Sequence, residues 1–402
     1  MKAIQYLFCL SLLMVGVLLF PGCTTDQEDG VLPNIDTLTE LTVKPSKGKV
    51  NELVTVSGKH FGNRPANITV RFNGAVAEVM EMNDSTIITK VPVNGSTGKV
   101  SVTRESVTLT STQDFIVLTG TWTRKKDFLG EARGNALTIS GVNSGFLTLG
   151  GSGDFTEKDF WEYLPASDVW IQKNDFPGLK RLGGVSFTIG NKIYITTGFT
   201  YWPLGFKNDF WEYNTETGTW TKKADFPGSG RIHAAAFVLD NKGYIAVGRG
   251  EYFDPEVKDM WEYDPATDKW TQKKDIPFNT LESAISFKLG DKAYVGGGYY
   301  FAGTESIKES YAFWQYEPNK DLWTALPDFN KEKKKFSLAF VLNNTPYLME
   351  ENGNCWQYNV TANQWLEKAP YPGGTGRNTF VVNNKAYVIE LNSRSLYEFN
   401  PE

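Results

Sequence analysis

The sequence predicts an all-β protein in which an immunoglobulin-like sandwich precedes a six-bladed β-propeller. Two observations predict the propeller. The segment GTWTRKKDFLG from Gly120 recurs as GTWTKKADFPG from Gly218, and W-E-Y or W-Q-Y triplets lie 50, 50, 53 and 42 residues apart. These triplets begin at Trp161, Trp211, Trp261, Trp314 and Trp356. A period of this size in strand-like sequence is typical of a blade of four strands. The sandwich is predicted by short strands with alternating apolar residues before residue 119.

The composition indicates a folded protein with no general affinity for nucleic acid. The chain has 402 residues, of which 41% are hydrophobic and 22% are charged, as in globular domains. Its formal net charge is −5, and its basic residues are not massed into runs that would bind phosphates. Of the cysteines, Cys9 and Cys23 lie near the N-terminus. Only Cys355 remains for the folded body, so we expect no internal disulfide and a buried thiol.

Residues 1–22 have the pattern of a signal peptide. Lys2 is followed by an apolar run, residues 6–20, which is too short to span a bilayer comfortably. Residues 19–23, Leu-Phe-Pro-Gly-Cys, resemble a bacterial lipobox. The resemblance implies that Cys23 becomes an acylated N-terminus; the alternative is an ordinary secreted protein cut elsewhere. Residues 23–33 then form the lipidated Cys and a tether.

The acidic residues after Cys23, in Thr-Thr-Asp-Gln-Glu-Asp-Gly, resemble the surface-export signal of Bacteroidetes lipoproteins. This resemblance implies an outer-membrane protein that is held by its lipid anchor and faces the cell exterior.

Residues 34–118 predict the sandwich. Apolar residues alternate in 41–43, 53–56, 68–72 and 100–102, and turn signals such as Asn73-Gly74 separate these pieces. About seven short strands suit an immunoglobulin-like domain. The order Val54-Thr-Val-Ser-Gly, Phe61-Gly and Val70-Arg-Phe-Asn-Gly resembles an IPT/TIG domain, which implies a spacer in bacterial surface proteins. His60 has no cluster of metal-ligating residues near it, so we expect a loop residue and no metal site.

Residues 119–402 contain the repeat. In the second copy the strand-like pieces are 181–189, 192–197, 209–214 and 219–223. A glycine follows four residues after the aromatic of the second strand, and a Trp follows nine residues after each triplet begins. This pattern resembles the kelch repeat. The glycine pair is complete only at Gly150-Gly151 and Gly297-Gly298, so the resemblance rests mainly on the period and on the Tyr and Trp positions.

The two ends of the repeat region are incomplete. Trp122 has no triplet before it, and the last triplet, at Leu396-Tyr-Glu-Phe, has no Trp after it. Joining the C-terminal FNPE to the TGTW that ends at Trp122 gives a sequence like YNTETGTW, which ends at Trp220. We therefore expect the N-terminal strand to close a six-bladed ring against the last three strands.

Sequence motifs for catalysis are nearly absent. The repeat region has one histidine, His233, and the chain has no Cys-x-x-Cys, His-Glu-x-x-His or Gly-x-Ser-x-Gly. We expect no catalytic residues, no metal and no cofactor.

Candidate ligand-binding residues gather at one end of the predicted ring. The long loops between the second and third strands carry Tyr201, Trp202, Tyr252, Phe253, Tyr299 and Tyr300. Arg133, Arg181 and Arg231 begin first strands at the same end, and His233 should face the same way. Aromatic faces stack on sugars, and Arg forks bind hydroxyls or carboxylates. The alternatives are structural: arginines that bond to carbonyls of the adjoining blade, and aromatics that pack loop against loop.

The architecture leaves three functions open. The first is a non-catalytic surface protein that binds a polysaccharide or oligosaccharide as a partner of an outer-membrane transporter complex for polysaccharide uptake. The second is a protein-binding adhesion or assembly module. The third is a sugar epimerase of the kelch mutarotase kind, which would use Arg and a carboxylate. The first is implied by the resemblance of the architecture and by no single residue.

Overall fold

The computed structural model describes residues 38–152, 155–250, 257–278, 281–301, 307–327, 329–330, 332–375, 377–390 and 393–402. The expected signal peptide, Cys23 and its tether lie outside the described residues, as do Tyr252 and Phe253. Regular structure in the described part is almost entirely strand; two short 3-10 turns are η1 (Pro65–Asn67) and η3 (Pro318–Lys320). Neither turn comes near the length and apolar character that a membrane-crossing helix needs, and the described residues contain no such helix.

The first domain is a sandwich of two sheets. One sheet has the order β1 (Thr39–Lys44), β3 (Leu53–Lys59), β7 (Thr86–Lys90) and β6 (Val79–Met82). The other has the order β2 (Lys47–Lys49), β9 (Val107–Leu118), β8 (Gly98–Arg104), β4 (Ile68–Phe72) and β5 (Ala75–Ala77). Alternate residues of β3, β4 and β8 point inward and are fully buried, as the sequence alternation predicts. Phe72 and Phe115 pack edge to face at the centre, with ring centroids 4.9 Å apart.

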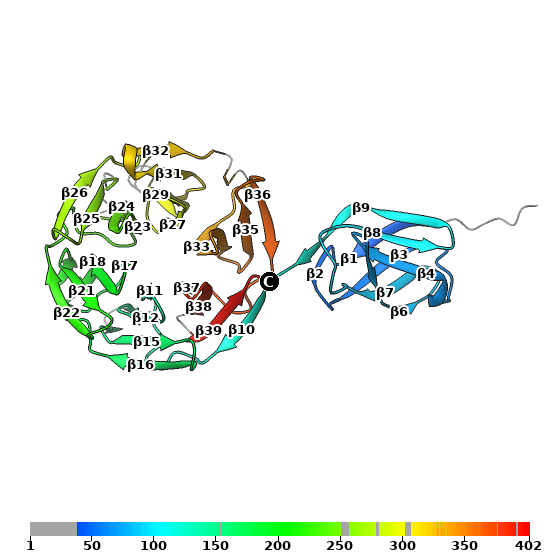
Figure 1. The fold of residues 1–402 in the computed structure, drawn as a ribbon, viewed down its shortest axis with the longest axis horizontal. Helices are drawn as coiled ribbons and strands as arrows, with labels where there is room; N and C mark the ends of the chain where they lie inside the picture. Colours follow the sequence, from blue (N-terminus) through cyan, green and yellow to red (C-terminus); the bar gives the residue numbers. More distant parts are fainter. Residues whose placement is uncertain are drawn as a thin grey trace, which may run out of the picture.

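The described part of residues 119–402 forms six four-stranded antiparallel sheets. Figure 1 shows them around a ring, each with its first strand near the axis and its last strand at the rim. The first three sheets contain β11 (Leu137–Ser140), β12 (Gly145–Thr148), β15 (Phe160–Leu164) and β16 (Val169–Lys173); β17 (Val185–Ile189), β18 (Lys192–Thr196), β21 (Phe210–Asn214) and β22 (Thr219–Lys223); and β23 (Ala235–Leu239), β24 (Lys242–Ala246), β25 (Met260–Asp264) and β26 (Lys269–Lys273).

The other three sheets follow in chain order, and the last of them takes a strand from the start of the repeat region. They contain β27 (Ile285–Leu289), β28 (Lys292–Gly296), β31 (Phe313–Glu317) and β32 (Leu322–Ala325); β33 (Phe336–Leu342), β34 (Thr345–Glu350), β35 (Cys355–Asn359) and β36 (Gln364–Lys368); and β37 (Arg377–Val382), β38 (Lys385–Glu390), β39 (Ser395–Asn400) and β10 (Thr121–Lys125).

The repeated tryptophans join neighbouring sheets. Each lies in the outermost strand, and its indole N–H donates to a backbone carbonyl that follows the outermost strand of the preceding sheet, at 2.8–3.2 Å. In four of the six sheets the tyrosine of the third strand donates its hydroxyl to an Asp or Asn in the next turn, as from Tyr263 to Asp268 at 2.8 Å. Asp268 also accepts the backbone N–H of Ala224 in the preceding sheet. The Tyr and Trp period of the sequence therefore records contacts between sheets.

The closing strand pairs as the matching ends of the sequence predict. β10 runs antiparallel to β39, with Trp122 opposite Phe399. The indole of Trp122 is half-buried, bonds to the carbonyl of Ala369 at 2.9 Å, and packs against Phe399 and Tyr371. The last sheet thus combines strands from both ends of residues 119–402, and Figure 1 shows the C-terminus beside β10 at the junction with the sandwich.

Three loops between second and third strands contain a hairpin that the sequence analysis did not predict. These are β13 (Gly151–Ser152) with β14 (Phe155–Thr156), β19 (Phe199–Tyr201) with β20 (Leu204–Phe206), and β29 (Tyr299–Phe301) with β30 (Ile307–Glu309). All loops between second and third strands lie at one end of the ring because each blade runs up and down. We call this end the loop face; it includes residues 149–152, 197–209, 297–301, 307–312 and 351–354.

Candidate functional site

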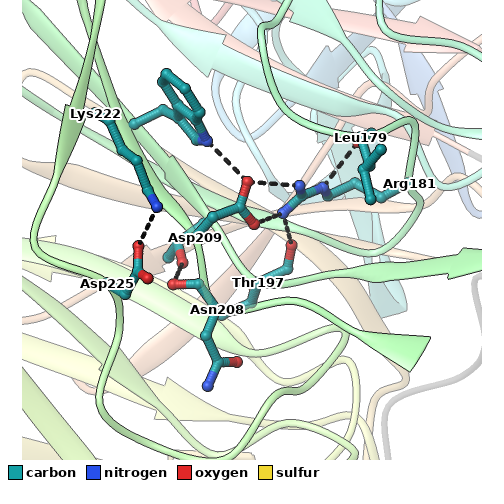
Figure 2. Close-up of polar contacts among 9 residues, drawn as sticks. Leu179, Arg181, Thr197, Asn208, Asp209, Lys222 and Asp225 are labelled. Atoms are coloured by element: carbon teal, nitrogen blue, oxygen red, sulfur yellow. Dashed lines mark hydrogen bonds and ion pairs between the residues drawn. The ribbon is translucent and has the colours of Figure 1, made fainter. Parts of the chain in front are cut away.

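Arg181 lies four residues before β17, the first strand of the second sheet, and is fully buried. Its guanidinium forms a fork with Asp209, with N–O distances of 2.6 and 2.8 Å, and donates to the carbonyls of Thr197 and Leu179 (Figure 2). The guanidinium carbon, Cζ, also lies over the Phe176 ring, 5.1 Å from its centre. These contacts use the fork and the face of the group, so Arg181 has little left to offer a ligand.

Asp209 is held in turn by a tryptophan. The indole N–H of Trp211 donates to the second carboxylate oxygen at 2.8 Å. Burial alone would raise the pKa of Asp209, but hydrogen bonds and charge from Arg181, with the bond from Trp211, outweigh it and lower that pKa below its ordinary value. The carboxylate therefore stays ionised inside the blade.

The same arrangement occurs in the two neighbouring sheets. Arg231 forks onto Asp259 at 2.7 and 3.0 Å, and Arg133 pairs with Asp159. Trp261 and Trp161 donate to those two carboxylates. All three arginines are buried. Each guanidinium bonds to the carboxylate of its own sheet and to nearby backbone carbonyls. These contacts favour the structural alternative, with acceptors in the arginine's own blade and in the loop before it, and give no support to the prediction that the arginines contact a ligand.

His233 lies two residues before β23, at the loop-face end of the third sheet. Its Nδ1 is 3.0 Å from an oxygen of Glu282, and Arg249 lies 3.3 Å from the same carboxylate. Burial raises the pKa of Glu282, but the contacts with His233 and Arg249 lower it further than burial raises it. This group links the third sheet to the fourth.

A chain of backbone bonds connects the inner strands of four sheets at this end. Gly183 donates to Asn135, His233 to Gly183, and Ser283 to His233, at 3.4, 2.9 and 3.1 Å. All four residues have positive φ, between 50° and 66°, which turns their N–H and C=O groups toward the neighbouring sheets.

The expected aromatics have different surroundings. Trp202 is 89% exposed at the tip of the β19–β20 hairpin, beside the part-exposed Tyr201 and the exposed Leu204. Tyr300 packs edge to face against Phe278, with centroids 5.8 Å apart, and so serves loop packing. Tyr299 donates its hydroxyl to Glu351 at 2.7 Å.

A cavity of about 520 Å³ opens on the loop face. Of the expected site residues that the structure describes, only Tyr299 lines it; Trp202, the arginines and His233 do not. Its lining comes from the first, fourth, fifth and last sheets, and Asn135 and Ser283, the two ends of the backbone chain, both belong to it. Most of the described lining carries hydroxyl, amide or carboxylate groups, with Lys335 as its one cation: Asn135, Ser283, Tyr299, Glu309, Ser310, Tyr311, Ser337, Glu351, Thr375 and Asn378.

We call each buried arginine with its paired aspartate an arginine clamp: Arg133 with Asp159, Arg181 with Asp209, and Arg231 with Asp259. Sequence reasoning missed both the carboxylates of these clamps and most of the cavity. The carboxylates carried a signal: Asp159, Asp209 and Asp259 each stand two residues before the triplet Trp, in exactly the three copies that have the Arg. The cavity residues carried none, because they converge from loops without a shared motif.

The remaining chemistry is sparse. Among the residues that the structure describes, no group of three His, Cys, Asp or Glu could hold a metal ion. Cys355 is fully buried on β35, and burial raises the pKa of its thiol to about 12, which keeps it protonated and inert.

Comparisons with known proteins agree with the two-domain fold. A family model described as an IPT/TIG domain matches residues 39–116, and one described as a Kelch motif matches residues 180–227. Among matching solved structures is a chain titled "Structure of YjhT", with a TM-score of 0.54 and 16% identity over 66% of this chain and 92% of that one. At this identity the likeness shows the fold alone. No curated protein matches the sequence.

The predicted fold class, an all-β chain with an IPT/TIG domain followed by kelch repeats, is therefore confirmed. These two modules together favour an interaction protein, and kelch domains are generally non-catalytic.

Proposed function

We propose that this protein binds a polysaccharide or oligosaccharide on its loop face, as a lipid-anchored component of a polysaccharide-uptake system at the cell surface. The observation that carries the proposal is Trp202. A large aromatic face that is 89% exposed is rare on a soluble domain, and Tyr201 and Leu204 extend the same apolar tip. Aromatic faces of this kind stack on the C–H surfaces of sugar rings.

Packing and hydrogen bonds within the β19–β20 hairpin hold the backbone of Trp202 in place. The ring of Phe199 packs edge to face against Tyr201 and Phe206, with centroids 5.3 and 5.2 Å apart. The buried hydroxyl of Thr200 bonds to both the N–H and the C=O of Trp202, at 3.3 and 3.1 Å. A tip held in this way loses less conformational entropy when a ligand binds.

The rest of the chain supports display of this face. The lipobox-like segment that ends at Cys23 would supply the anchor, and the IPT/TIG domain would act as a spacer. Thr119 bonds to the backbone of Ala369 at 2.9 Å, and Lys47 pairs with Glu367 at 2.5 Å, so the spacer contacts the fifth sheet directly. A partner transporter would receive the bound glycan.

A protein partner is the second candidate. The tip of the β19–β20 hairpin is convex, and a protruding Trp is also a frequent anchor in protein interfaces.

Affinity electrophoresis separates the two candidates. The purified protein is run through gels that contain neutral, amino or acidic polysaccharides, with serum albumin as the unretarded control. Glycan binding predicts retardation by at least one polysaccharide. Unaltered migration in every gel would contradict glycan binding and favour a protein partner.

A further inference from the structure

The cavity on the loop face has features of a built site. Ser310 is 6% exposed and lines the cavity, yet its hydroxyl has no hydrogen-bond partner within the described part of the chain. Its backbone is fixed, because its N–H donates to Gly298 at 2.8 Å. A buried hydroxyl without a partner costs about 1–3 kcal/mol relative to a satisfied one, so its retention is explained if a ligand bonds to it.

The first of two carboxylates in the cavity lining belongs to Glu309. Glu309 accepts from the hydroxyl of Tyr311 and pairs with Lys335. These contacts lower the pKa of Glu309 and raise the pKa of Lys335, so both are ionised at neutral pH. Lys335, the one cation among the described residues of the lining, is thus already engaged by a carboxylate.

The second carboxylate of the lining is Glu351, whose backbone N–H donates to the carbonyl of Lys335 at 3.3 Å. Glu351 accepts from Tyr299 at 2.7 Å, and this bond, more than burial, raises the pKa of Tyr299 to about 12. Among the described residues, the lining therefore carries two carboxylates against one ammonium group and no arginine. A ligand with carboxylate or sulfate groups would meet repulsion here, whereas hydroxyl or amino groups could donate to the carboxylates.

We infer that this cavity is the sugar-specific subsite of the protein and that it takes a sugar unit without negative charge, either neutral or bearing an amine. The inference rests on the proposed function. At about 520 Å³ the cavity has the size of small-ligand sites and holds one or two sugar rings, while Trp202 lies outside it and contacts a more distant part of the same glycan.

Two variants of the full chain test the inference, with polysaccharide gels and titration of the polysaccharide that retards the wild type. Ser310→Ala should weaken binding at least about fivefold without lowering the melting temperature, since the hydroxyl has no protein partner to lose. Glu351→Gln should reduce the discrimination against polygalacturonate and alginate. Glu216→Gln, which removes an exposed carboxylate from a turn at the opposite end of the ring, is the matched control and should change neither property.

The expected pattern is retardation by a neutral polysaccharide or by chitosan and none by polygalacturonate or alginate. Preferential binding of an acidic polysaccharide would overturn the inference and leave the proposed function standing. So would a result in which Trp202→Ala abolishes binding while Ser310→Ala and Glu351→Gln bind like the wild type. Failure of every polysaccharide to bind the wild type would remove the proposed function, and the inference with it.

Discussion

A buried guanidinium needs a full set of acceptors, and each of the three arginine clamps supplies one. The arginine and the aspartate of a clamp form a unit, because each sheet of the ring has either both residues or neither. In the fourth sheet Leu281 stands at the Arg position and Ala312 at the Asp position. Leu281 is fully buried in an apolar cluster with Phe278 and Trp314. An apolar pair therefore replaces the ion pair at an equivalent place in the same fold.

Removing one member of a clamp should be costly. Arg181→Leu leaves the half-buried carboxylate of Asp209 without its cation, so we expect a loss of about 3 kcal/mol in the free energy of unfolding, measured by urea denaturation. The fourth sheet supplies the matched control. The double variant Arg181→Leu, Asp209→Ala copies Leu281 and Ala312 and should regain at least half of that loss. Equal stability of the single and double variants would show that the pair is not a unit.

The clamps also predict the acid sensitivity of the fold. The pKa values of Asp159, Asp209 and Asp259 lie below the ordinary carboxyl value of about 3.9. On acidification the unfolded chain therefore takes up these protons first. The stabilisation is complete above about pH 5 and is lost as the pH falls through the lower, folded-state values. The free energy of unfolding should fall between about pH 5 and pH 3, less steeply in the double variant. Identical slopes would contradict this role.

At the scale of elements, the sequence predicted the strands of the ring wherever the same contact recurs in successive sheets. The Tyr and Trp of each copy bond across sheet boundaries, so their spacing predicted the strands and the pairing of Trp122 with the last three strands. The hairpins within the loops were missed because β19 and β20 have three residues each, too few for a periodic signal. The cavity was missed because Ser310 and Glu351 are brought together by the ring and share no pattern in the chain.

The closing strand tests the ring at this scale. Trp122→Ala removes a half-buried indole and its bond to Ala369, so we expect a loss of about 2–3 kcal/mol in thermal or urea unfolding, less than for a fully buried Trp. Deleting residues 396–402 removes most of β39 and exposes two strand edges, which should give an insoluble protein. Near-wild-type melting of both variants would contradict six blades closed by β10.

At the scale of the whole molecule, the sandwich and the ring meet through short contacts. β9 ends at Leu118, and Thr119 forms a parallel bridge with Lys368 and accepts from its ammonium group at 2.6 Å. The chain then enters β10 within two residues. The strand that closes the ring is thus also the one that connects it to the sandwich.

The proposed lipid anchor at Cys23 is testable in cells. Cys23→Ala should move the protein from the membrane fraction to the soluble fraction, because no residue then carries the lipid. Replacing Asp26, Glu28 and Asp29 by Ala should leave it in the membrane fraction but protect it from protease added outside the cell. Unchanged cleavage by that protease would remove the role of the acidic residues in export to the surface.

The most direct test of glycan binding is the affinity of the Trp202→Ala variant for the polysaccharide that retards the wild type, measured by isothermal titration. Because Trp202 is almost fully exposed, the variant should melt like the wild type. Loss of an aromatic anchor usually costs about 2 kcal/mol or more, so the dissociation constant should rise at least about thirtyfold. Leu53→Ala, which removes an exposed apolar side chain from the sandwich, should bind unchanged. Wild-type affinity in Trp202→Ala would contradict a glycan platform on the loop-face hairpin.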